Sequence, residues 1–234
     1  MEKNLIITGS DFPDSRAFVT AALENGFSVM VSIPEGDTPQ GLQDPVQSFV
    51  WQRTSSVSAR SFVLDAQTSL VKLTHAIVIF DVPLYIKNVF VKDSQTLSRG
   101  VDVLISSYMY ITQEIINRFV RQDGGTLCFV FKPYCIDKTV SRNEIFSPSK
   151  TLVLSAASAF KTFAEQTASS YAASNLNFLL IEDNTFSDKE KESADFLFSL
   201  LETASFSKKG GKKQFSHWIK AGSKISSAWN FFNR

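Results

Sequence analysis

The sequence predicts an α/β protein built on a Rossmann-like, doubly wound parallel sheet with helices on both faces. Two observations lead to this prediction. Short apolar runs typical of buried strands alternate with amphipathic, helix-forming segments along nearly all of the 234 residues. The opening of the chain also has a strand, turn, helix, strand pattern, which is the βαβ unit of parallel sheets. A doubly wound sheet satisfies both observations.

The first predicted unit has turn signals at both ends of its helix. Residues 5–9 form an apolar run that predicts a strand, and residues 15–25 carry apolar side chains at helical spacing. Gly26 stands where a helix C-cap belongs. Residues 27–33 form a second β-rich run, which Pro34 closes. These two strands are therefore predicted to be parallel.

The next part of the chain predicts two further strands and one ambiguous segment. Residues 48–53 fit either an extra edge strand or a short helix. Residues 61–65 predict the third main strand, and residues 76–80 predict the fourth. A short helix is expected at 67–73, between these two strands.

The second half of the chain alternates helices and strands. We predict helices at 101–122, 154–173 and 189–203, and strands at 126–131, 177–181 and 214–219. No internal repeat or linker divides the chain, so residues 1–222 are predicted to form a single domain. Residues 223–234 form an extension that we expect to be helical, because Ile225, Trp229 and Phe232 share one helical face.

Composition and charge exclude several classes of function. The chain has 24 Lys plus Arg against 23 Asp plus Glu, and its net charge of +1 offers no global attraction for nucleic acid. The longest apolar runs, such as 76–80 and 178–181, are far shorter than the roughly 20 residues that cross a bilayer. No apolar signal region follows Met1, so we expect a cytoplasmic protein without a transmembrane segment.

The few cysteines and histidines do not predict a metal centre. Cys128 and Cys135 make neither a disulfide framework nor a ligand set, and we interpret them as buried or bystander thiols. His75 and His217 have no partners at ligand spacing. The basic segment from Lys208 to Lys213 fits a solvated turn, or a site for a phosphate or an acidic partner.

The turn after the first predicted strand reads Thr8-Gly9-Ser10-Asp11-Phe12-Pro13-Asp14-Ser15, and Arg16 begins the next helix. This turn and the order of the elements resemble the short-chain dehydrogenase/reductase family over nearly the whole chain. The first turn of that family has the pattern Thr-Gly-x-x-x-Gly-x-Gly, and Thr8-Gly9 begins the same turn here. Pro13 and Ser15 stand at the second and third glycine positions, and Arg16 matches the helix that follows. The resemblance implies NAD(P) as the cofactor of such a fold.

The resemblance also implies which residues contact that cofactor. Thr8, Gly9 and Arg16 occupy family contact positions in the first turn and helix. Asp65 falls at the acidic position that contacts adenine after the third strand. The segment Phe80-Asp81-Val82-Pro83 replaces the Asn-Asn-Ala-Gly tetrapeptide of the family.

The catalytic positions of the family are held by residues that cannot perform its chemistry. Val153 stands at the catalytic tyrosine, Ala157 at the catalytic lysine, Lys132 near the catalytic serine and Asp102 at the helix asparagine. Hydride transfer to a carbonyl needs a proton donor for the developing alkoxide, and valine and alanine supply none. The resemblance therefore predicts the fold of the family, whereas the residues at the catalytic positions predict that hydride transfer does not take place.

Dinucleotide binding is disfavoured on physical grounds as well. Pro13 lacks an N–H group for a phosphate, and Asp11 and Asp14 place negative charge where the phosphates would lie. We expect no bound cofactor, and we hypothesise a non-catalytic protein that binds a partner protein or a regulatory ligand. The alternative is a divergent NAD(P)-dependent oxidoreductase with an altered cofactor pose, in which Lys132 or Asp81 acts as acid or base.

The resemblance further implies a homodimer. The helices at 101–122 and 154–173 match those that form the dimer interface of the family. The extension at 223–234 is a candidate site for a protein partner, although it also fits packing on the body of the protein. A third hypothesis is a peripheral membrane scaffold that uses this extension and the basic segment at 208–213.

Overall fold

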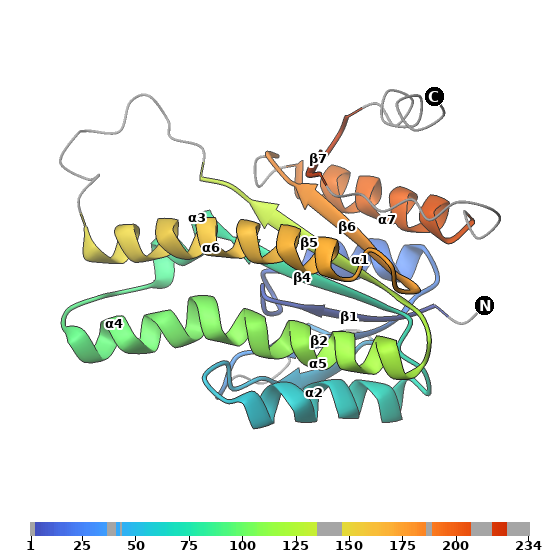
Figure 1. Ribbon diagram of the computed structural model, residues 1–234, viewed down its shortest axis with the longest axis horizontal. Coiled ribbons are helices and arrows are strands. Elements are labelled where there is room, and N and C mark those ends of the chain that lie inside the picture. The colour runs from blue at the N-terminus through green and yellow to red at the C-terminus, as the bar shows by residue number, and fades with distance from the viewer. Residues whose placement is uncertain are drawn as a thin grey trace.

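The computed structural model describes residues 3–36, 41–42, 44–134, 147–185, 189–206 and 217–223. The strands in this part of the chain are β1 (Asn4–Thr8), β2 (Ser28–Ile33), β3 (Gln47–Val50), β4 (His75–Asp81), β5 (Gly125–Lys132), β6 (Leu176–Glu182) and β7 (Ile219–Lys220). They form one sheet in the order β3-β2-β1-β4-β5-β6-β7, and every neighbouring pair is parallel (Figure 1). The predicted fold class is confirmed.

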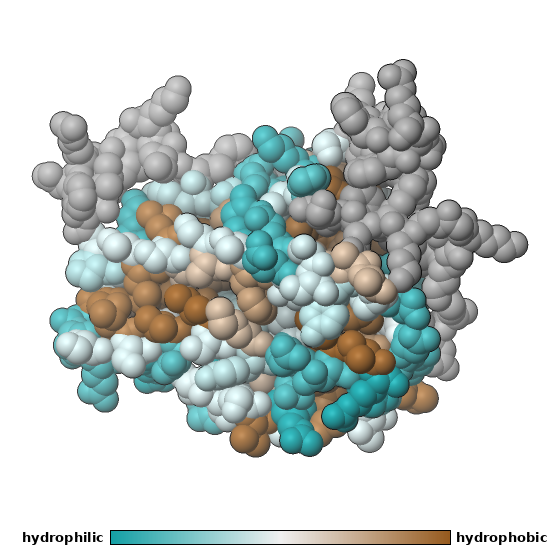
Figure 2. All heavy atoms as spheres, viewed as in Figure 1, coloured by the Kyte–Doolittle hydropathy of each residue, from teal (hydrophilic) through white to brown (hydrophobic). Residues whose placement is uncertain are grey.

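Helices lie on both faces of this sheet. They are α1 (Arg16–Glu24), α2 (Ser56–Ser69), α3 (Val82–Asn88), α4 (Ser94–Val101), the π-helical segment η1 (Asp102–Ser106), α5 (Ser107–Arg121), α6 (Pro148–Ser170) and α7 (Glu190–Phe206). Helices α2, α5 and α6 cover one face, and α1 and α7 cover the other (Figure 1). On the first of these faces, Figure 2 shows hydrophobic surface between α6 and α4.

The central strands are buried on both sides, which explains their uninterrupted apolar runs. In β4, Val78 and Phe80 pack with α2, α5 and α6, whereas Ile77 and Ile79 pack with α1 and α7. These four side chains are fully buried. Parallel strands between two helical layers have no solvent-facing side, so polar residues do not alternate with apolar ones.

The predicted strand at 61–65 is wrong, because these residues belong to α2. The Ser55 side chain caps this helix by accepting a hydrogen bond from the Ser58 backbone N–H at 3.2 Å. Phe62 and Val63 are buried at helical spacing from other apolar residues, whereas the neighbouring Leu64 is half exposed. The third strand is β3, so of the two interpretations of residues 48–53 the strand is confirmed for residues 48–50, and residues 51–53 follow its end.

Other expectations hold with changed boundaries. The helix predicted at 101–122 begins earlier, because α4, η1 and α5 follow one another without a break. Of the strand predicted at 214–219, the described part contains Ile219 and Lys220 in β7. The basic segment at 208–213 and residues 224–234 of the extension lie outside the described residues. Within the described part, no helix is long and apolar enough to span a bilayer.

Candidate functional site

The switch point of the sheet, where open parallel sheets bind ligands in a crevice, lies between the carboxyl ends of β1 and β4. The strands run outward from β1 in one direction and from β4 in the other, so the order of the chain reverses between them. In open parallel sheets, ligands bind outside the carboxyl ends of the strands at such a switch point. The residues at this position are Thr8 and Gly9 after β1 and Asp81 at the end of β4.

Gly9 is required here by the packing of the backbone. Its φ angle is +92°, which favours glycine, and a Cβ atom at this position would lie 2.2 Å from the carbonyl oxygen of Ile79. No other residue fits between the two strand ends. The glycine that the sequence shares with the family pattern therefore has a structural reason that does not depend on a cofactor.

Three side chains from separate elements converge on the carbonyl oxygen of Gly9. The Nη2 atom of Arg53 donates to it at 2.6 Å, and the Tyr85 hydroxyl lies at 2.8 Å. The Tyr108 hydroxyl lies 3.1 Å from the same oxygen and 2.8 Å from the carbonyl oxygen of Ile79. We call Arg53, Tyr85 and Tyr108 the crevice plug. Tyr108 thus joins the ends of β1 and β4.

The plug is also bonded within itself. The two tyrosine hydroxyl oxygens are 2.5 Å apart, and Arg53 donates to Tyr85 at 2.9 Å. Both tyrosines are buried, and burial raises their pKa values, so their hydroxyls stay protonated. Each hydroxyl then satisfies a backbone or side-chain acceptor, as buried polar groups require.

An ion pair with Asp11 holds the Arg53 guanidinium in place. The two charged groups are 2.9 Å apart, and their side chains are only 12% and 15% exposed. The Ser32 hydroxyl donates to the other carboxylate oxygen of Asp11 at 2.5 Å. The guanidinium carbon of Arg53 lies 4.7 Å from the centre of the Trp51 ring, which is a cation–π contact. Burial works against the charge on Arg53, but Asp11 and the tyrosines outweigh it and hold its pKa well above the ordinary value.

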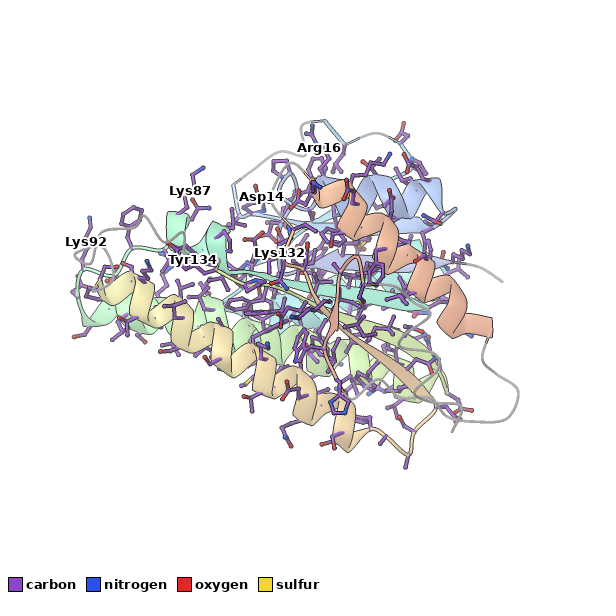
Figure 3. All side chains as sticks on the ribbon, turned by 90° about the horizontal axis from the view of Figure 1, so that it is seen from above. Asp14, Arg16, Lys87, Lys92, Lys132 and Tyr134 are labelled. Carbon is purple, nitrogen blue, oxygen red and sulfur yellow. The ribbon has the colours of Figure 1, made fainter. Side chains whose placement is uncertain are left out.

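A second group of charged residues lies along the same edge of the sheet, around Lys132 at the end of β5. We call Lys132, Asp14, Asp81, Asp183 and Glu190 the Lys132 cluster. The Lys132 ammonium is 3.3 Å from an Asp81 carboxylate oxygen and forms an ion pair with Glu190. Figure 3 shows Lys132 among the side chains at this end of the strands, with Asp14 near it in the turn that precedes α1.

The electrostatics of this cluster are dominated by carboxylates. Burial raises the pKa of Asp14, as do the nearby negative charges of Asp81 and Asp11, and Glu190 acts in the same direction. Burial disfavours the charge on Lys132, but Asp81 and Glu190 outweigh it and raise the pKa of the ammonium. Lys132 is thus a fixed cation rather than a proton donor near neutral pH.

The predicted site residues are only partly brought together. Thr8 and Gly9 lie at the crevice, where the Thr8 hydroxyl donates to Ser32 at 3.1 Å. Arg16 is exposed at the rim, with its guanidinium 5.3 Å from the Phe12 ring centre. Asp65 is an exposed residue in the middle of α2 and does not follow the third strand. Trp51, Gln52 and Arg53 take that place instead.

The four family catalytic positions form no acid–base pair. Val153 and Ala157 are buried in α6, and Lys132 is held by carboxylates. Asp102 lies in η1, where the Ser106 hydroxyl is 3.4 Å from its carboxylate. The chain does bring another tyrosine and lysine together, because the Lys150 ammonium is 3.4 Å from the Tyr134 hydroxyl.

The fold of this chain is similar to the folds of solved structures, although its sequence matches no known family. No protein-family model and no curated protein matches the sequence. A short-chain dehydrogenase from Streptomyces avermitilis is 11% identical, with 99% of this chain and 90% of that chain covered and a TM-score of 0.63. The enoyl-[acyl-carrier-protein] reductase (NADH) from Aquifex aeolicus is also 11% identical, with 94% of both chains covered and a TM-score of 0.67.

The chain has the short-chain dehydrogenase fold. A further similar structure is a metagenomic short-chain oxidoreductase in complex with NADP, which is 8% identical over 93% of this chain and 96% of that chain, with a TM-score of 0.63. At such low identity the likeness concerns the fold alone, and the function depends on the residues at the site. Those residues are the crevice plug and the Lys132 cluster.

Proposed function

We propose that this chain is a non-catalytic protein with the short-chain dehydrogenase fold that acts by binding a partner protein or a regulatory ligand. The observation that carries the proposal is the crevice plug. Arg53 donates to the Gly9 carbonyl, and the hydroxyls of Tyr85 and Tyr108 lie 2.8 and 3.1 Å from the same oxygen, so the three side chains gather at the switch point. A dinucleotide could enter this position only by displacing them.

Displacement of the plug is costly because its charges are buried. Moving Arg53 leaves the Asp11 carboxylate, with its side chain 15% exposed, without its cation. Removing one partner of a buried ion pair typically costs about 3–5 kcal/mol. A pyrophosphate would then meet Asp11 and Asp14 as well, and like charges in a partly desolvated site repel. Both effects oppose the usual dinucleotide pose.

The experiment that tests the proposal is a titration with NADH and NADPH, followed by tryptophan fluorescence and thermal unfolding. We expect no saturable change up to millimolar cofactor. A ligand at 100 times its dissociation constant stabilises a protein by about 2.7 kcal/mol, or roughly 5–10 °C in Tm for a chain of this size. A saturable signal with such a shift would overturn the proposal.

A divergent NAD(P)-dependent oxidoreductase is the second candidate function. The pair formed by Tyr134 and Lys150 favours it, because a tyrosine hydroxyl beside a lysine ammonium can donate a proton to the alkoxide that forms when hydride is transferred to a carbonyl. This candidate requires cofactor binding in the titration above. It also requires that Tyr134→Phe abolish any reductase activity while cofactor affinity stays unchanged.

We also propose a homodimer in which helices 101–122 and 154–173 face their counterparts. Exposed apolar side chains support it, with Tyr110 37% and Leu154 41% accessible on α5 and α6. An isologous interface needs such a patch to be self-complementary. Light scattering coupled to size exclusion should give about twice the chain mass of 26.1 kDa. A single-chain mass at micromolar concentration would exclude the dimer.

A further inference from the structure

The last strand of the sheet, β7, has little strand pairing to hold it in place at the outer edge of β6 (Figure 1). β6 pairs with β5 along its whole length, from Leu176 to Glu182, but it pairs with β7 only through Ile181 and Glu182. One more backbone hydrogen bond follows, because the Ala221 N–H donates to the Glu182 carbonyl oxygen at 2.9 Å. A strand of two residues is shorter than is usual in a stable sheet, so other groups must hold this segment.

Trp218, the residue before β7, anchors the segment on α6 and β5. Its indole N–H donates to the Glu165 carboxylate at 2.6 Å. Its ring contacts the Phe131 ring edge-on, with the ring centres 5.9 Å apart. The Lys161 ammonium lies 5.3 Å from the centre of the Trp218 ring and donates to Glu182 at 2.8 Å. Trp218 therefore has a hydrogen bond to a carboxylate and two ring contacts, all with residues outside its own segment.

The segment 217–223 contributes no fully buried residue to the core. Trp218 packs at the border of the apolar cluster on the α6 side of the sheet. Ile219 and Ala221 pack at the border of the cluster on the side of α1 and α7. Regions with few buried apolar contacts and few backbone hydrogen bonds open at a lower free energy than the core does. The core can therefore stay intact when this segment leaves it.

We propose that residues 217–223 form a latch that opens and closes on the intact body of the protein, with Trp218 as its anchor. Opening breaks the contacts of Trp218 and the pairing of β7 with β6. It also uncovers one side of the Phe131 ring, which is only 6% exposed in the closed form. Because Phe131 precedes Lys132, the latch controls the apolar surface that is exposed beside the Lys132 cluster. The latch does not depend on the proposed function, because none of the contacts of Trp218 named above involves the crevice plug.

Amide hydrogen exchange in the full chain, followed for single residues by NMR, tests the latch. Two amides that bond to opposite neighbours of the same region serve as probes. The Ala221 N–H donates to the Glu182 carbonyl at 2.9 Å, and the Asp183 N–H donates to the Phe131 carbonyl at 2.8 Å. Exchange at Ala221 reports opening of the latch, whereas exchange at Asp183 reports opening of the body. We expect Ala221 to exchange on the order of 100-fold faster than Asp183, after correction for intrinsic rates.

Substitutions at Glu165 separate the hydrogen bond of Trp218 from the stability of the body, because Glu165 is only partly buried on α6. Glu165→Ala removes the acceptor of the indole N–H, and a hydrogen bond to a charged group changes an opening equilibrium by about tenfold or more. We therefore expect about tenfold faster exchange at Ala221 and an unchanged rate at Asp183. The matched control is Glu165→Gln, which keeps an acceptor oxygen and should change the Ala221 rate by less than about threefold. Trp218→Ala should accelerate Ala221 more than Glu165→Ala does, because the ring contacts are lost as well.

Three results would overturn the latch. They are equal exchange rates at Ala221 and Asp183 in the unchanged protein, equal acceleration at both amides by Trp218→Ala, and an Ala221 rate that Glu165→Ala leaves unaltered. The first two results would mean that the segment opens only together with the body. The third would mean that the hydrogen bond between Trp218 and Glu165 does not hold the segment.

Discussion

Replacing Arg53 with methionine should destabilise the protein strongly, because this residue is the charged centre of the crevice plug. Arg53 pairs with Asp11 at 2.9 Å, donates to the Gly9 carbonyl at 2.6 Å and donates to Tyr85 at 2.9 Å. Removing one partner of a buried pair costs about 3–5 kcal/mol, whereas an exposed pair contributes about 0–1 kcal/mol. The first range applies because the two side chains are 12% and 15% exposed.

Urea unfolding measures this loss directly. With a denaturant slope of about 3 kcal/mol per molar, a loss of about 3–5 kcal/mol in Arg53→Met should lower the unfolding midpoint by about 1–1.7 M. The double variant with Asp11→Asn should lose less than the sum of the single losses, because it leaves no unpaired charge. A loss below about 1 kcal/mol, or strictly additive losses, would refute the reasoning that the plug is a buried and coupled network.

Three further predictions follow from the packing, the hydrogen bonds and the ionisation of other residues. Gly9→Ala should cost about 2–3 kcal/mol more than Gly26→Ala in urea unfolding, because both have positive φ but a Cβ at Gly26 meets nothing within 4 Å. Equal losses would contradict the close approach of the strand ends. Tyr108→Phe should cost about 1–2 kcal/mol by the same assay, since the Ile79 carbonyl loses its side-chain donor; an unchanged midpoint would contradict that hydrogen bond. Burial and the charge of Lys3 lower the pKa of His75 to about 4. Because the pKa in the unfolded chain is about 6.5, protonation favours unfolding, and up to about 3 kcal/mol should be lost as the pH falls from 6.5 to 4. His75→Gln should remove this part of the pH dependence, and an unaltered dependence would contradict the assignment.

The central sheet could be predicted from the sequence because its strands are buried on both faces. Such strands are continuous apolar runs, and β4 and β5 lie where these runs predict them. Residues 61–65 misled the prediction because three consecutive apolar residues fit a buried strand as well as a helix. The helix is distinguished from the strand by the Ser55 cap and by the helical spacing of the buried residues in α2. Which residues are buried is known only from the folded chain.

The candidate site was harder to predict than the fold. The resemblance pointed to Gly9 but not to its partners, because Arg53, Tyr85 and Tyr108 are 44, 76 and 99 residues away in the sequence. No local pattern shows that three elements converge on one carbonyl oxygen. The sequence did carry one signal, because Arg53 is a charged residue three positions after the end of an edge strand. That signal can be recognised only once the position of β3 is known.

Several sequence predictions remain to be tested by experiment. The cytoplasmic location and the single domain over residues 1–222 stay predictions. The proposed roles of the basic segment at 208–213 and of the extension at 223–234 concern residues that lie mostly outside the described part of the chain. Deleting residues 223–234 and measuring partner capture and liposome binding would separate a protein-binding role from a membrane-binding role.

The most direct test of the central claim is a crystal structure determined from crystals grown with about 10 mM NADPH, a concentration far above the dissociation constant of a working cofactor site. The account predicts that the switch point contains no dinucleotide and that the Arg53 guanidinium remains hydrogen-bonded to the Gly9 carbonyl, as it is here at 2.6 Å. Density for a dinucleotide along the carboxyl ends of β1 and β4, with Arg53 displaced, would contradict it.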